Sequence, residues 1–141
     1  MKKFWSLLHK FFFGFCVNIK IMLIKKNQAK IVDQGTKIIR KYTAPDRQLE
    51  INHMVLNGRT PEKEGTFLCE TKLHFMVFVV KGKGKIFRGD EVFDVEEGDC
   101  VDVLPNTKFA AQGYDFEYIT AESPAWYPEQ AKIVNKDGNV L

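Results

Sequence analysis

The sequence predicts a single domain built almost entirely of β-strands and closed into a sandwich or a barrel. Three observations predict this fold class. From about residue 30 onward, apolar residues recur with a period of two rather than 3.6. Short runs rich in β-branched and aromatic residues alternate with turn residues. The chain has 141 residues, of which 45% are hydrophobic, and this is enough for one domain with a buried core.

Eight strands are expected in the body of the chain, residues 30–141. They are Lys37–Tyr42, Leu49–Leu56, Thr66–Glu70, Leu73–Val80, Lys85–Arg88, Glu91–Val95, Cys100–Leu104 and Phe116–Thr120. The turns expected between them include Asn57-Gly58, Gly89-Asp90, Gly98-Asp99 and Gln112-Gly113. Gly89-Asp90 has the residue types of a two-residue hairpin turn.

The run from Phe75 to Val80 is apolar at every position. A strand with one wet face alternates, so this strand is expected to be covered on both faces. If Phe75 points into the barrel, the outward side chains are Met76, Phe78 and Val80. Monomers rarely expose a patch of this kind, so the sequence predicts a homodimer through these three residues.

Residues 1–29 form a leader of different composition. Residues 1–30 hold seven lysines and no acidic residue, whereas residues 31–141 carry a formal charge of −4. Three interpretations of the leader stay open: a start mis-assigned upstream of Met22, a membrane-surface segment within residues 1–24, and an export signal. Lysines interrupt its apolar run, so no membrane-spanning helix is expected. The acidic body argues against nucleic-acid binding.

The cysteines Cys16, Cys69 and Cys100 are odd in number and widely spaced, with no C-x-x-C pair. This pattern is typical of free thiols in a reducing compartment. It predicts a cytoplasmic location, with neither a disulfide framework nor a zinc ribbon.

The stretch from Gly82 to Gly113 resembles the cupin family of small jelly-roll barrels. The second cupin motif reads G-x5-P-x-G-x2-H-x3-N. Here Gly98 matches, the proline is shifted by one position, Phe109 stands for the His and Gly113 for the Asn. The first motif ends E-x6-G, and Phe75 stands for that Glu, seven residues before Gly82. The resemblance covers about residues 35–128 and implies a cupin-type jelly-roll β-barrel.

Metal-binding cupins hold their ion with two His and a Glu from the first motif and one His from the second. The corresponding positions here are Cys69 and Thr71, or Leu68 and Glu70 with the longer motif spacing, followed by Phe75 and Phe109. A phenyl ring has no lone pair to give a metal. The resemblance therefore implies a cupin with no metal and no other cofactor.

The expected ligand-pocket residues are His53, Cys69, Thr71, Phe75, Phe109 and Tyr118. They would form a small, largely apolar pocket for a small organic ligand, or the aromatic rings would instead fill the barrel as core. The aromatic segment Pro124–Pro128 is expected to cover the barrel mouth, to pack across a dimer or to plug the core.

The expected function is that of a metal-free cupin that binds an unknown small organic ligand, as a binding or regulatory module. No catalytic residue is assigned. The alternative is a cupin-type enzyme that isomerises or epimerises a sugar or a small organic acid. Its base would be His53 or His74, and its acid would be one of Tyr42, Tyr114 and Tyr118. A third interpretation is a scaffold without a ligand.

Overall fold

The computed structural model describes residues 23–141. Its strands are β1 (Lys30–Asp33), β2 (Lys37–Thr43), β3 (Glu50–Thr60), β4 (Thr66–Glu70), β5 (His74–Lys81), β6 (Lys83–Arg88), β7 (Glu91–Glu96), β8 (Cys100–Val103), β9 (Lys108–Ser123) and β10 (Ala131–Asn135). Two short 3₁₀-helices, η1 (Lys26–Gln28) and η2 (Pro128–Gln130), precede β1 and β10. The predicted all-β fold class is confirmed.

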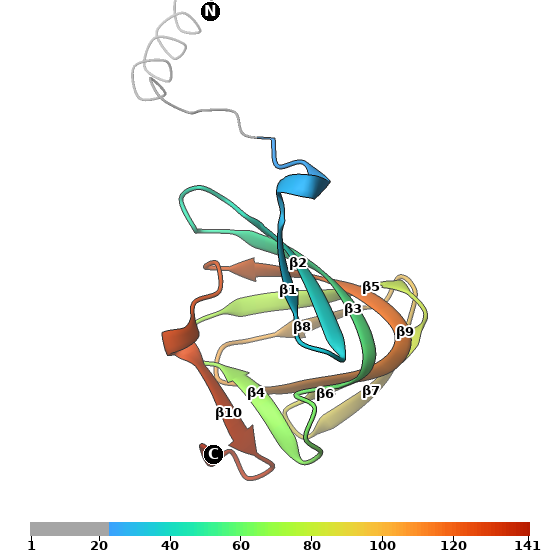
Figure 1. The fold of residues 1–141 in the computed structure, drawn as a ribbon. Helices are drawn as coiled ribbons and strands as arrows, with labels where there is room; N and C mark the ends of the chain where they lie inside the picture. Colours follow the sequence, from blue (N-terminus) through green and yellow to red (C-terminus); the bar gives the residue numbers. More distant parts are fainter. Residues whose placement is uncertain (1–22) are drawn as a thin grey trace, which may run out of the picture.

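The strands pair antiparallel and curl into a jelly-roll barrel (Figure 1). One path of neighbours runs β1-β2-β3-β9-β4-β10. The long strand β9 also pairs with β5 and β6, which in turn pair with β8 and β7. Strand β9 is therefore shared by both walls of the barrel, and β1 and β10 are the two ends of the path.

The curvature of β9 depends on glycine where the chain passes Phe116. A Cβ atom placed on Gly113 would lie 2.7 Å from the Cβ of Phe116, and one on Gly84 would lie 2.6 Å from its Cε1. Neither distance is tolerable, so only glycine lets the two strands close over the Phe116 ring. Gln112-Gly113 is thus part of a strand, and the turn predicted there is wrong.

Other strand boundaries also differ from the prediction. Strand β3 continues through Asn57-Gly58 as an irregularity in the register rather than a turn. Strands β1 and β10 were not expected. The hairpin at Gly89-Asp90 is confirmed, since Arg88 pairs with Glu91 across it.

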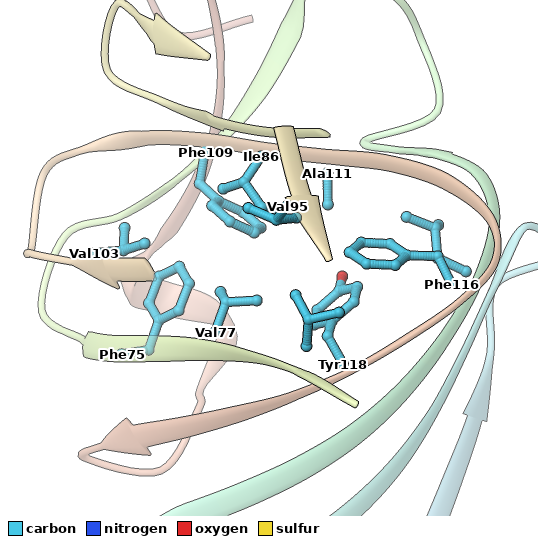
Figure 2. Packing of buried hydrophobic residues seen from close by; sticks show 11 residues of the cluster. Phe75, Val77, Ile86, Val95, Val103, Phe109, Ala111, Phe116 and Tyr118 are labelled. Atoms are coloured by element: carbon cyan, nitrogen blue, oxygen red, sulfur yellow. The ribbon is translucent and has the colours of Figure 1, made fainter. Parts of the chain in front are cut away.

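The core lies between the walls of the barrel and is built mainly from aromatic and branched side chains (Figure 2). Leu56, Ile86 and Phe116 are fully buried. The rings of Phe75 and Phe109 meet edge to face, with their centroids 5.2 Å apart. Burial of each such side chain contributes roughly 1.5–3 kcal/mol.

The predicted facing of β5 is confirmed. Phe75, Val77 and Val79 are buried, whereas Met76, Phe78 and Val80 are 45%, 47% and 41% exposed. Ile51 of β3 and Ile38 of β2 are also exposed, and β9 lies between β3 and β5.

The leader falls mostly on residues 1–22, so its three interpretations lie outside the described residues, as does Cys16. Strand β1 begins at Lys30. Within residues 23–141, none of the helices has the length and apolar character that crossing a membrane requires.

Candidate functional site

A cavity of about 590 Å³ opens into the barrel. Residues of β1 and β10 line it, together with inward-facing residues of β2, β3, β4 and β9. Because β1 and β10 are the ends of the strand path, neither has a further strand of residues 23–141 beside it on its outer side. The cavity therefore lies at the open seam of the barrel.

The cavity has a polar side made by paired positions on β3 and β9. Asn52 lies opposite Thr120, and Glu50 lies opposite Glu122. The Asn52 amide donates to the Thr120 hydroxyl at 3.2 Å and to the carboxylate of Glu122. The Thr120 hydroxyl donates to the same Glu122 oxygen at 3.3 Å. All four side chains are buried, so this network is built into the barrel interior.

Lys41 joins this network from β2. Its Nζ lies 2.6 Å from Glu50 Oε1 and 5.5 Å from the centre of the Trp126 ring. The Thr43 hydroxyl donates to the other Glu50 oxygen at 2.6 Å. Burial acts to raise the pKa of Glu50, but the hydrogen bonds from Lys41 and Thr43 outweigh it, and the pKa falls below 4.5. Glu50 is therefore a carboxylate that holds the Lys41 ammonium in place.

Glu70 enters the cavity from β4. The Trp126 indole Nε1 donates to Glu70 Oε1 at 3.1 Å, and the Gln130 amide donates to Glu70 Oε2. Burial raises the pKa of Glu70 in spite of these hydrogen bonds. The segment after β9 thus contributes Trp126 to the cavity wall, as one of the predicted alternatives proposed.

Two groups on the cavity wall have pKa values that approach neutrality. Burial, followed by the charge of Glu50, raises the pKa of Glu122 from 4.5 to about 7. Burial lowers the pKa of Lys37 from 10.5 to about 8, although the charges of Glu70 and Glu122 act against this. An acid and a base adjusted in this way can exchange protons with a ligand near neutral pH.

The opposite side of the cavity is apolar, with Phe75, Phe109 and Met54 among its residues. Tyr118 also lines it, is 1% exposed and turns its ring into the barrel (Figure 2). Within residues 23–141, neither the Tyr118 hydroxyl nor the Asn52 carbonyl oxygen has a hydrogen-bond partner. Buried polar atoms are nearly always paired in native proteins. These two atoms are therefore exceptions among the buried polar groups of residues 23–141.

Of the six predicted pocket residues, Phe75, Phe109 and Tyr118 line the cavity. His53 does not, because its neighbour Asn52 takes the inward position on β3. Its ring nitrogen instead lies 3.1 Å from a carboxylate oxygen of Glu117. The predicted pairing of His53 with Tyr118 as base and acid is therefore not assembled.

Cys69 and Thr71 also do not line the cavity. Leu68 and Glu70 take the inward positions of β4, so the longer motif spacing applies. Thr71 donates to the carbonyl of Gln130 at 2.7 Å. Burial raises the pKa of the Cys69 thiol, which disfavours the nucleophilic thiolate.

The donor set at the cupin metal positions does not fit a metal ion. Leu68, Phe75 and Phe109 carry no donor atom. Glu70 is the single donor there, and both of its oxygens accept hydrogen bonds. One occupied carboxylate does not hold a divalent cation.

The sequence analysis missed Lys37, Lys41, Glu50, Asn52, Thr120 and Glu122. A signal was present: the alternate positions 118, 120 and 122 of β9 are Tyr, Thr and Glu. However, the intervening Ile119 and Ala121 are the apolar set, and a strand normally turns its apolar set inward. Here the polar set faces inward and lines the cavity.

Neither a protein-family model nor a curated protein matches this chain. Solved structures do share its fold. The chain is similar to Streptomyces PAC13, described as a nucleoside dehydratase and solved with uridine, with a TM-score of 0.71 and 15% identity over 82% of this chain and 92% of that one.

Two further neighbours have the same architecture. Ectoine synthase from P. lautus has a TM-score of 0.63 and 13% identity over 81% of this chain and 90% of that one. An RmlC-like cupin from Shewanella frigidimarina has a TM-score of 0.62 and 16% identity over 75% and 93%. The chain therefore has the cupin-type jelly-roll fold, as the sequence motifs predict.

Proposed function

We propose that this protein binds a small polar organic molecule in the barrel cavity and catalyses a proton transfer on it without a metal ion. The observation that carries the proposal is the presence of Glu122 and Lys37 on one cavity wall, with pKa values of about 7 and about 8. Each group is thus partly neutral at physiological pH. Glu50, which is paired with Lys41, has instead a lowered pKa, so burial alone does not produce this adjustment.

The remaining lining residues support the binding of a molecule with several polar groups. Asn52 and Tyr118 offer unpaired polar atoms, and Lys41 offers a fixed positive charge. Phe75 and Phe109 offer an apolar surface for a carbon skeleton. A hydroxylated carbonyl compound, such as a sugar, a hydroxy acid or an oxidised nucleoside, has this combination of groups.

This proposal favours the enzyme over the binding module that the sequence analysis placed first. Two of the solved neighbours are named as enzymes, a nucleoside dehydratase and ectoine synthase. They share only the fold at this level of identity, so the proposal depends on the residues of this chain. A purely apolar cavity would have favoured a binding module.

The test is a proton-exchange assay that needs no knowledge of the natural substrate. Aldoses, ketoses, hydroxy acids and nucleoside aldehydes are incubated with the protein in D₂O, and loss of the proton next to the carbonyl is followed by NMR. We expect exchange on a subset of them and a loss of about 10²–10⁴-fold in rate for Glu122→Gln. Glu129→Gln, the same change at an exposed residue that is not among the cavity-lining residues, is the matched control. Binding of a panel member without exchange would support the binding module instead.

We also propose that a second copy of the chain covers the outer face of β5 and β3. Phe78 lies beside Ile119, and Met76 beside Ala121, which in turn lies beside Ile51. These rows make a continuous apolar surface across three strands. Because a twofold interface joins the same surface on both copies, an apolar face of this shape can cover itself.

A further inference from the structure

Lys37 differs from the other lysines of the cavity. Lys41 is held by Glu50 at 2.6 Å. Lys30 and Lys132 are exposed on the edge strands. Lys37 is partly buried and lines the cavity, and within residues 23–141 its ammonium has no ion pair or hydrogen bond. It is therefore an amine that lines the cavity and takes part in no ion pair within residues 23–141.

The surroundings of Lys37 are those of a nucleophile. The titratable groups that act on it are Glu70 from β4, Lys41 four residues along its own strand, and Glu122 from β9. Burial is the largest influence and favours the neutral amine, whose lone pair can attack. Glu122 lines the same cavity, and its charge acts on Lys37. With its raised pKa it is partly protonated near neutral pH and can supply a proton.

We propose that Lys37 Nζ attacks the carbonyl carbon of an aldehyde or ketone bound in the cavity and holds it as an imine. The amine lone pair forms the N–C bond, and the carbonyl electron pair moves to oxygen, which takes a proton from the nitrogen. Protonated Glu122 then gives its proton to this hydroxyl, the C–O bond breaks, and water leaves. The products are an iminium ion, one water and the Glu122 carboxylate, so no oxidant or reductant is needed.

This inference rests on the proposed function, since it uses the same cavity, and it adds the class of ligand. An iminium ion acidifies the neighbouring C–H bonds. Imine formation therefore explains why an amine and a carboxyl group whose pKa values are both shifted toward 7 occur in the same cavity. The Phe75 and Phe109 wall helps because it limits access of water to the imine.

The experiment traps the imine with glyceraldehyde as the probe. The full chain is treated with a small excess of glyceraldehyde and sodium cyanoborohydride at pH 7.5, and modified lysines are mapped by peptide mass spectrometry. An amine with a lower pKa has a larger neutral fraction but a less basic lone pair, so we expect Lys37 to be labelled on the order of tenfold more than Lys30 or Lys132. Unfolding in urea should abolish this preference.

Lys37→Arg should remove the preferred label, and Lys132→Arg should leave it unchanged. Equal labelling of Lys37 and the exposed lysines in the folded wild type would overturn the proposal, whatever the variants do. The outcome is independent of the exchange assay. Exchange that depends on Glu122 without selective labelling of Lys37 leaves the proposed function standing and removes the imine. Selective labelling of Lys37 without proton exchange would leave the imine standing and remove the proposed proton transfer.

Discussion

Replacement of Tyr118 by Phe tests whether the Tyr118 hydroxyl is unpaired in the folded protein, as the proposed ligand binding requires. The Tyr118 hydroxyl is buried, and no group within residues 23–141 bonds to it. Burial without a partner costs about 1–3 kcal/mol. Phe keeps the ring and its contact with Phe116, whose centroid is 5.4 Å away, and removes only the hydroxyl. We expect the free energy of unfolding to rise by about 1 kcal/mol.

Urea unfolding followed by tryptophan fluorescence measures this change. A gain of about 1 kcal/mol corresponds to a rise of roughly 3–5 °C in Tm for a domain of this size. Tyr114→Phe is the matched control because Tyr114 is 75% exposed, and its change should stay within about 0.5 kcal/mol. Any panel ligand that binds should bind Tyr118→Phe about 2–10-fold more weakly. A loss of 1 kcal/mol or more in Tyr118→Phe would show that the hydroxyl has a structural partner, and the reasoning would fail.

Four further predictions follow from the structure and the sequence. Glu122 has a raised pKa, so the folded state binds more protons than the unfolded state between pH 4.5 and about 7. The free energy of unfolding should therefore fall by up to about 3 kcal/mol as pH rises through this range. Denaturant titrations of Glu122→Gln should show a smaller decline with pH, and a decline equal to that of the wild type would contradict the prediction. Phe78→Lys should give a monomer by light scattering while Phe93→Lys, an exposed residue of β7, should not; a monomeric wild type at micromolar concentration would refute the dimer. Elemental analysis of protein purified without chelators or affinity metals should find no stoichiometric transition metal. A chain that begins at Met22 should melt at the temperature of the full chain, and a large fall would show that residues 1–21 pack on the barrel.

The fold could be predicted from the sequence because its signals are local. The period of two and the turn at Gly89-Asp90 both survive in the structure. The turn prediction was wrong where a long-range contact, rather than a turn, requires the glycine. Gly113 was interpreted as a turn residue, but it is required by Phe116, whose ring leaves no room for a Cβ atom. A sequence does not display that contact, since it depends on how far the strand bends.

The site was harder to predict because it depends on register. Successive side chains of a strand point to opposite faces, so an error of one position exchanges the whole set. Choosing Cys69 and Thr71 rather than Leu68 and Glu70 on β4 replaced a carboxylate with a thiol. The pocket consequently appeared apolar. On β5 the same reasoning succeeded, because Phe75 was anchored by its spacing from Gly82.

The inward side chains of β3 and β9 change from apolar to polar along the barrel. The apolar and polar positions have different effects on stability. Leu56 lies opposite Phe116 just before the register shift in the pairing, and Glu50 lies opposite Glu122 at one end of it. The apolar positions stabilise the fold through burial. The polar positions do the opposite, because Glu122 is held away from its preferred ionised state and Tyr118 keeps an unpaired hydroxyl. A barrel needing only stability would lose such groups, since replacing them with Gln and Phe is expected to stabilise it. Their presence on the cavity wall therefore supports the proposed ligand, whose binding would use groups that the fold alone leaves destabilised or unpaired.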